Sequence, residues 1–345
     1  KQRLHDIGDA RLEIEEALAA PLTDPVSGTP VTGPLRRRSV RALSLAFVLG
    51  GVVATAALWL AMRPLVRQTV APVTRLLVGV GPAEQLGGDE GRPTRTAMAL
   101  SPDVRWLVFS AVRGSEIQLY LRRLDELEAR SIPGTEGGVS PFFSPDGQWV
   151  GFSAAGELKK TPLSGGPAVT LCKTDIPFGA SWGADDRIVF ALASGGLWQV
   201  SARGGTAEAL TSPDTKQGEV SHRLPQVLPG SDAVLFTVTR NRFPKWDETQ
   251  VVVYSRRTGS RKVLIEGGAD ARYVPTGHVV YARQGVLMAA PFDVTRLEVT
   301  GGPVGVEVDL MQAAYHTNSG DESGAAQFSV SDTGALVYVS GGVFP

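Results

Sequence analysis

The chain has 345 residues with 34 basic and 35 acidic side chains, so its formal net charge is −1. This length allows one large domain or two to three smaller ones, and the balanced charge gives no global electrostatic basis for nucleic-acid binding. Cys172 is the only cysteine, which excludes an intramolecular disulfide and a cysteine-based metal site.

The first 41 residues predict a helix and then a linker. Between Leu4 and Leu18 apolar residues recur at helical spacing, with glutamates on the other side, so residues 1–20 are expected to form one amphipathic helix, too short to be a domain. Residues 21–35 are rich in Pro, Gly, Ser and Thr and predict a flexible linker. With the basic flank RRRSVR, this linker runs over residues 21–41.

Residues 42–62, ALSLAFVLGGVVATAALWLAM, are uncharged and predict a transmembrane helix. A helix of this length spans about 32 Å, against about 30 Å of bilayer hydrocarbon. A buried soluble helix is the alternative, but such helices are seldom this long without a polar group. A cleaved signal peptide fits less well, because the apolar run is long and starts late. Residues 63–72 are expected to form a short stalk.

The flanks of this segment favour one orientation. Arg36, Arg37, Arg38 and Arg41 precede it, whereas only Arg63, Arg67 and Arg75 follow. The positive-inside rule therefore favours a cytoplasmic N-terminus, by a narrow margin. This places the chain in the cytoplasmic (inner) membrane as a single-pass protein, with residues 73–345 in the periplasm or otherwise extracytoplasmic.

Small residues recur four apart within the predicted span, at Ala46, Gly50 and Ala54. This spacing lets two helices approach closely, so these residues predict a dimer face and a homodimer through the span. The alternative is ordinary composition, because Ala and Gly are common in such helices.

From residue 73 onward the periodicity becomes two, and a hairpin repeats six times at roughly 45 residues, the size of a propeller blade. Each copy joins turn-forming residues to an apolar run that contains Phe or Tyr. The copies are LSPDVRWLVFSA (100–111), FSPDGQWVGFSA (143–154), WGADDRIVFALA (182–193), VLPGSDAVLFTV (227–238), YVPTGHVVYARQ (273–284) and SVSDTGALVYVS (329–340).

A second hairpin follows each of the first five, so each unit predicts four strands. We therefore expect an all-β fold: a β-propeller of about six four-stranded blades over residues 73–345, the last blade incomplete. Residues 73–80, VTRLLVGV, are a candidate for an outer strand that closes the ring. The aspartates of the turns are explained by turn chemistry, without a metal or catalytic role.

Two loops are longer than a blade requires. The first, 239–250, carries Arg240, Arg242, Lys245 and Trp246, and the second, 311–327, carries Tyr315 and His316. Long loops on a rigid ring are common docking sites, and Arg and Trp are frequent hot-spot residues. These six residues are therefore candidates for partner binding, those of the first loop before those of the second, although a solvated insertion is the simpler explanation of both loops.

The sequence carries no catalytic motif. It lacks a Gly-rich loop with its lysine, His-Arg-Asp, Asp-Phe-Gly and G-x-S-x-G. None of the four histidines has a neighbour at ligand spacing, so no metal site is expected. No cofactor is expected in this chain, and the acidic polar side of the first helix argues against a DNA-binding head.

Two resemblances add to this interpretation. The SPDG turn followed by an apolar aromatic strand resembles the TolB-like, WD-repeat-like propeller repeat, which implies the fold and leaves the function open. RLHDIGDARLEIEEAL resembles the last C-lobe helix of bacterial transmembrane serine/threonine protein kinases with an extracytoplasmic propeller. That resemblance implies that Arg3 would pair with the glutamate of an Ala-Pro-Glu motif, and that ATP and Mg²⁺ would belong to a kinase domain absent from these residues.

Two functions follow as expectations. In the first, the propeller binds an unknown ligand or protein outside the cytoplasm and signals through the span to the kinase. In the second, it is a membrane-anchored scaffold for protein–protein interaction without kinase activity.

Overall fold

The computed structural model describes residues 76–88, 91–241, 245–314 and 322–343. The chain divides into two compact units, Lys1–Arg75 and Leu76–Pro345, and the described residues all belong to the second. Within them the fold is all-β, and the one helix is the three-residue 3-10 helix η1 (Thr215–Gln217).

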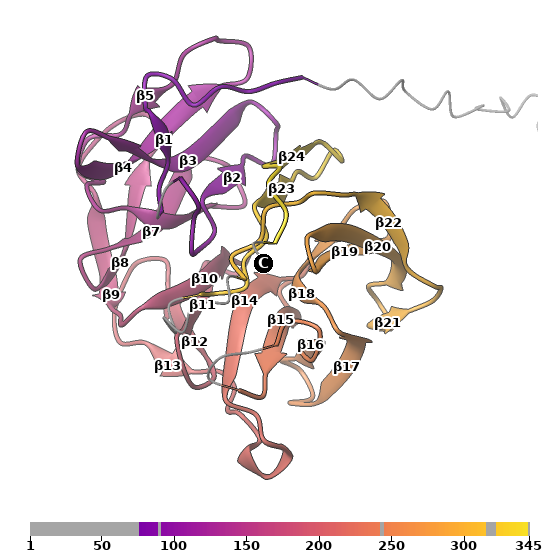
Figure 1. The fold of residues 1–345 in the computed structure, drawn as a ribbon. Coiled ribbons are helices and arrows are strands. Elements are labelled where there is room, and N and C mark those ends of the chain that lie inside the picture. Colours follow the sequence, from indigo (N-terminus) through magenta and orange to yellow (C-terminus); the bar gives the residue numbers. More distant parts are fainter. Residues whose placement is uncertain (1–75, 89–90, 242–244, 315–321, 344–345) are drawn as a thin grey trace, which may run out of the picture. The chain divides into compact units, whose positions relative to one another are not determined.

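Five antiparallel sheets of four or five strands form the blades of a propeller (Figure 1). Most blades begin with an inner strand, continue through a hairpin and end with a short outer strand. The first two blades contain β1 (Gln85–Leu86), β2 (Met98–Leu100), β3 (Trp106–Arg113), β4 (Glu116–Arg123) and β5 (Arg130–Ser131), then β6 (Val139–Phe143), β7 (Trp149–Ala154), β8 (Glu157–Pro162) and β9 (Val169–Lys173).

The next three blades repeat this order. Their strands are β10 (Pro177–Trp182), β11 (Arg187–Leu192), β12 (Leu197–Ser201) and β13 (Glu208–Ala209); β14 (Ser221–Val227), β15 (Ala233–Thr239), β16 (Gln250–Ser255) and β17 (Arg261–Glu266); β18 (Ala269–Val274), β19 (His278–Arg283), β20 (Val286–Asp293), β21 (Glu298–Val299) and β22 (Val304–Glu307).

A two-stranded hairpin, β23 (Phe328–Val330) and β24 (Leu336–Tyr338), occupies the remaining place in the ring. β23 contacts β2, and Val337 and Val339 pack against the core of the first blade, so this hairpin joins the fifth blade to the first (Figure 1). The ring therefore closes without a sixth full blade.

The predicted count of about six blades is wrong, because the structure has five. All six repeated hairpins exist, but the sixth has only its two strands. Residues 309–314 pair with the segments that flank this hairpin, through isolated bridges between Leu310 and Ser340 and between Gln312 and Ala326. Residues 76–80 form no strand, with Leu77 fully exposed, so the expected outer strand at 73–80 is also wrong over its described part.

The expected helices are not part of the fold that the structure shows. No helix among the described residues is long and apolar enough to cross a membrane. The predicted amphipathic helix 1–20 and the predicted span 42–62 lie outside the described residues.

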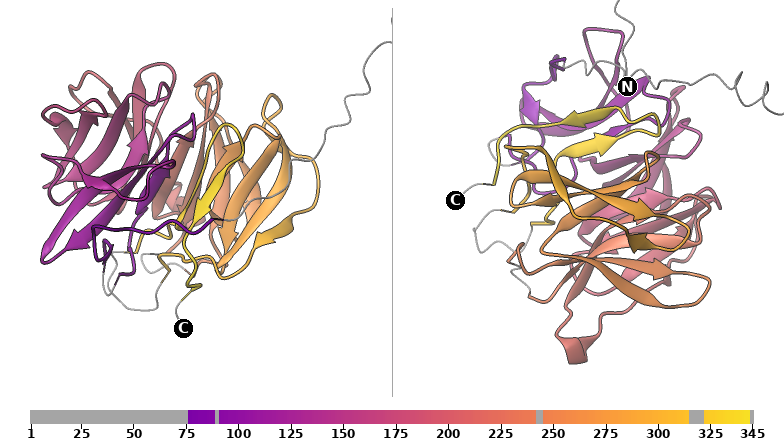
Figure 2. Two further views of the ribbon diagram at one scale, coloured as in Figure 1. Left: turned by 90° about the horizontal axis from the view of Figure 1, so that it is seen from above. Right: turned by 90° about the vertical axis from the view of Figure 1, so that its right-hand side faces the viewer.

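The core lies between the blades. Each inter-blade cluster takes apolar residues from the facing sheets, as where Val108 and Leu119 of the first blade meet Val150 and Phe152 of the second. Figure 2 shows from the side that the strands run across the thickness of the ring. One face of the ring consequently carries the turns that join each inner strand to the next strand.

Candidate functional site

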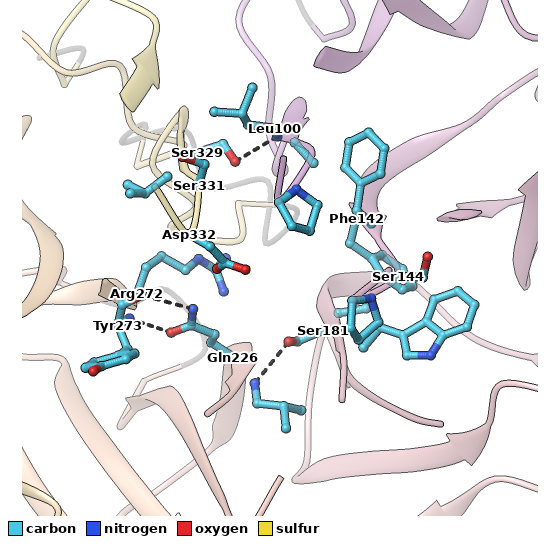
Figure 3. Close-up of a pocket in the computed structure, with 18 of the residues that line it drawn as sticks. Leu100, Phe142, Ser144, Ser181, Gln226, Arg272, Tyr273, Ser329, Ser331 and Asp332 are labelled. Carbon is cyan, nitrogen blue, oxygen red and sulfur yellow. Dashed lines mark hydrogen bonds between the residues drawn. The ribbon is translucent and has the colours of Figure 1, made fainter. Parts of the chain in front are cut away.

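A cavity of about 360 Å³ opens at the centre of the face that carries these turns; we call it the cup. The ends of the inner strands β2, β6, β10, β14, β18 and β23 line it, and the following turns form its rim (Figure 3). Its volume lies near the lower end of the range of roughly 300–1,000 Å³ found for ligand pockets.

The rim shows why the repeated Ser-Pro-Asp sequence forms a tight turn. Ser144 Oγ donates to the Asp146 carboxylate, which accepts from the backbone N–H of Gln148. Ser101 and Asp103 repeat this arrangement in the first blade. These hydrogen bonds, led by that from the serine hydroxyl, lower the pKa of both carboxyls. For these two aspartates the predicted turn role is confirmed.

Below the rim, the side chains two residues before each turn form one level of the cup. They are Ala99, Phe142, Ser181, Gln226, Arg272 and Ser329. Three of them fasten their blade to the next by accepting a backbone N–H. Ser181 Oγ accepts from Val227 at 3.0 Å and Ser329 Oγ from Leu100 at 2.9 Å, while Gln226 Oε1 accepts from Tyr273 (Figure 3).

Arg272 is the one charged side chain of this level. Its Nη1 donates to the carbonyl oxygen of Pro225 at 2.9 Å, and its Nη2 forms an ion pair with Asp270 Oδ1. Asp270 precedes it by two residues on β18, lies deeper in the ring and is 1% exposed. Burial raises the pKa of Asp270, against the opposing effect of Arg272.

Three polar atoms around the cup have no hydrogen-bond partner among the described residues. They are Thr96 Oγ1, Ser140 Oγ and Trp182 Nε1. Ser140 is 4% exposed, so its hydroxyl is buried against the cup wall. Buried polar groups are usually hydrogen-bonded, so these three atoms are exceptions to that rule.

The segment 322–327 precedes β23 and bonds to residues 94–97, just before the inner strand β2, at the opposite end of the inner strands from the cup; we call it the plug. All six residues are buried. Ala326 N–H donates to Asp270 Oδ2 at 2.9 Å, and Gln327 Nε2 donates to the carbonyl of Arg95. Asp270 thus connects the cup arginine to the plug.

Arg223 is also buried near the plug, 1% exposed on β14. Its guanidinium donates to Ser221 Oγ and to the carbonyls of Glu322 and Ala193, and stacks over Phe178 at 4.6 Å. Burial lowers the pKa of Arg223 to about 10. These contacts give it a structural role at the ring centre.

The predicted site residues lie elsewhere. Arg3, Ala46, Gly50, Ala54, Arg242, Tyr315 and His316 lie outside the described residues. Arg240 is exposed, and Lys245 is exposed in an ion pair with Glu248. Arg240 and Lys245 do not line the cup, and the role of all these residues in partner binding stays a prediction.

Trp246 departs from the expected surface position. It is 9% exposed and packs against Ala269 and Ala314, with the backbone of Gly324 directly over its ring. The indole fills the interior beneath the loop, so it is not exposed for a docking partner. The flanks of the second loop, 311–314 and 322–327, are likewise buried.

The sequence interpretation did not identify the cup residues. The signal was present in the repeat: when the six turns are aligned, Arg272 is the only charge two residues before a turn. The Arg272–Asp270 pair and the unpartnered hydroxyls required the structure.

Comparison with known proteins is consistent with this architecture. The chain is similar to the structure of a TolB candidate from Agrobacterium tumefaciens, with 17% identity and a TM-score of 0.52, over 72% of this chain and 90% of that one. TolB from Acinetobacter baumannii is 19% identical with a TM-score of 0.48, over 57% of this chain; the match spans 51% of that protein. Neither a protein-family model nor a curated protein matches the sequence.

The fold and its central cup define a β-propeller. More particularly, the described residues have the TolB-like β-propeller fold. Identities this low show the fold alone.

Proposed function

We propose that this propeller is a protein-binding domain and that its partner docks in the cup. The observation that supports this is the cup itself, in which the aromatic side chains Phe142 and Trp182 lie with the polar side chains Gln226 and Arg272 at the ring centre. Aromatic side chains and arginine are enriched in protein-binding hot spots. Among the described lining residues, the ionisable side chains are Arg272, Tyr273 and Asp332.

Photo-crosslinking tests this proposal. A photoreactive amino acid replaces exposed Asp332 at the rim, and in a control it replaces Ser115, which lies in the turn at the opposite end of β3. Both variants of the full-length protein are expressed in the native host. The rim variant is expected to give one specific protein adduct, identified by mass spectrometry, and the Ser115 variant is not. Equal adducts at both positions, or none at the rim, would reject the proposal.

The wider setting rests on residues 1–72. In sequence, a predicted helix, a Pro- and Gly-rich stretch, a basic flank and an apolar segment follow one another, and with the kinase-like resemblance at Arg3 this order supports our proposal of an extracytoplasmic sensor domain of a membrane serine/threonine kinase. The membrane location, the homodimer and the link to ATP and Mg²⁺ in a separate domain stay predictions. A membrane-anchored scaffold without kinase activity is the alternative.

Reading the coding sequence upstream of Lys1 separates these two settings. A Gly-rich loop, a strand lysine, His-Arg-Asp, Asp-Phe-Gly and Ala-Pro-Glu would support the kinase setting. A start codon directly before Lys1 would reject it and leave the scaffold.

A further inference from the structure

Arg272 supplies the chemistry that specifies what the cup binds. We propose that the cup takes a single carboxylate of a polypeptide, either its C-terminal carboxylate or that of an acidic side group, and that Arg272 pairs with it. The proposal rests on the proposed function, since it names the chemistry by which the docking partner is recognised.

The first step is that Arg272 contacts the neighbouring blade in a different way from the other polar side chains of its level. At the same level Ser181, Gln226 and Ser329 accept a backbone N–H from the next blade. A guanidinium has no acceptor and cannot make this bond. Arg272 instead donates to the Pro225 carbonyl of the preceding blade and pairs with buried Asp270, and among the described residues of this level it alone brings a positive charge to the cup.

The second step is that the guanidinium keeps donors for a ligand. It has five N–H groups, and its contacts with Pro225 and Asp270 use one direction each of Nη1 and Nη2. The side chain is 19% exposed and extends toward the middle of the cup in Figure 3. Arginine is well suited to bind carboxylates because its fork makes two parallel hydrogen bonds.

The third step concerns Asp270, which acts as a positioning residue. One of its oxygens is held by the Ala326 N–H of the plug, and the other holds Nη2 of Arg272. Because Asp270 is fully buried below the cup floor, it fixes the guanidinium from beneath and leaves the upper side to a ligand.

The fourth step is the surroundings. The rim of the cup adds the exposed polar side chain of Asp332, and Ser329 and Gln226 lie at the level of Arg272. Phe142 offers an apolar wall for a neighbouring side chain. The other charged lining residue is Asp332 at the rim, so the lining is too weakly basic for a phosphate dianion.

Peptide binding to the full-length protein tests the proposal. The probes are fluorescein-labelled tripeptide pools that end in phenylalanine, leucine or valine. One pool has a free C-terminal carboxylate, one is amidated, and one is amidated with a central glutamate. Fluorescence anisotropy is expected to show at least tenfold tighter binding for a carboxylate pool than for the neutral amide, and the two carboxylate pools distinguish a C-terminal from a side-group carboxylate.

Variants assign the effect to Arg272. Arg272→Gln is expected to remove the preference for carboxylate, and Arg272→Lys to keep part of it, because the charge remains and the fork is lost. Arg113→Gln is the control, since Arg113 is exposed at the opposite end of β3 from the rim. Arg272→Gln alone leaves the buried Asp270 carboxylate without its partner and could destabilise the protein. The double variant Asp270→Asn, Arg272→Gln removes both charges and avoids this effect.

Equal binding of acid and amide pools to the unaltered protein would overturn the inference, as would no binding at millimolar peptide or an unchanged preference in Arg272→Gln. The crosslinking experiment separates this failure from failure of the proposed function. A specific adduct at Asp332 that persists in Arg272→Gln would keep cup docking and reject carboxylate recognition. Absence of a rim adduct would reject cup docking itself.

Discussion

One cross-strand pair beside the cup has its large and small side chains in opposite places in the first two blades, and this difference predicts the effect of mutations on stability. In the first blade Ala99 faces Val108 across β2 and β3, whereas in the second blade Phe142 faces Gly151 across β6 and β7. A Cβ on Gly151 would lie 2.1 Å from Phe142 Cζ, far inside ordinary contact at 3.4–4 Å. Gly151→Val must therefore displace the Phe142 ring.

The magnitudes follow from core-packing rules. Gly151→Val alone is expected to lower the free energy of unfolding by roughly 1–3 kcal/mol through overpacking, and Phe142→Ala by roughly 3–5 kcal/mol through the space it leaves. The double variant recreates the Ala–Val pairing of the first blade. It is expected to cost about as much as Phe142→Ala alone, which gives a coupling energy of about 1–3 kcal/mol.

Urea denaturation followed by tryptophan fluorescence measures this cycle. Trp182 lies edge-to-face with Phe142 at 6.4 Å between ring centroids, so it also reports displacement of the ring. Gly302→Val is the control, because Gly302 is exposed and a Cβ added there would have no atom within 4 Å, and it should change stability by less than about 0.5 kcal/mol. Additivity of the two single changes within about 0.5 kcal/mol would refute the reasoning.

Three further predictions concern the ring centre and the loop before the fourth blade. Gly324→Ala should lower the free energy of unfolding by about 2–4 kcal/mol, because φ is +80° and the new Cβ would overlap the Trp246 ring; unchanged urea midpoints would contradict it. Arg223→Met should cost roughly 2–5 kcal/mol, because it leaves buried carbonyls unpaired; a neutral or stabilising result would show that apolar packing suffices. Burial lowers the pKa of His222, so the unfolded state binds more protons below about pH 6.5, and stability should fall as the pH drops from 7 to 5.5. His222→Gln should flatten this slope by up to about 1.4 kcal/mol per pH unit, and identical slopes in urea denaturation would contradict it.

The His222 prediction rests on a defined network. The ring is fully buried, with Nδ1 at 2.7 Å from Thr211 Oγ1 and Nε2 at 3.1 Å from Glu219 Oε2. Arg261 Nη1 reaches the same carboxylate oxygen at 2.8 Å and lies 3.3 Å from Nε2. Burial lowers the pKa of His222, Glu219 raises it and Arg261 lowers it further, and the lowering effects prevail.

The repeat was the part of the fold that could be predicted from sequence. The hydrogen bonds of a turn are local, so Ser144 and Asp146 predict their hairpin whatever the rest of the protein contains. The blade count was harder, because outer strands such as β5 and β13 have two residues each and exist only through pairing. The sequence did show that the sixth copy lacks a second hairpin, but it could not show that the two-stranded β23–β24 would close a ring of five blades.

Long-range packing explains the other differences. Trp246 looked like a surface anchor because its loop is polar, but Gly324 and Ala314, nearly 80 and 70 residues away in sequence, create the site that buries it. Asp270 could not be placed by alternation either. The pairing register of β18 with β19 shifts between Ala269 and Arg272, and Asp270 has φ +52°. The alternation of side chains along a strand therefore does not predict which side chains of β18 face the ring centre.

The fifth blade connects these observations to function. In a repeat fold, shared positions build the ring, and a departure from the repeat needs a local cause. In this blade Thr276-Gly277 replaces the Asp-Gly turn, β22 is present as a fifth strand, and Arg272 and Asp270 are the charges at two successive levels of the inner strand β18. Neither charge belongs to the turn: Asp270 holds the Ala326 N–H of the plug, and Arg272 holds the Pro225 carbonyl and lines the cup. This blade therefore holds the group that we expect the partner's carboxylate to meet.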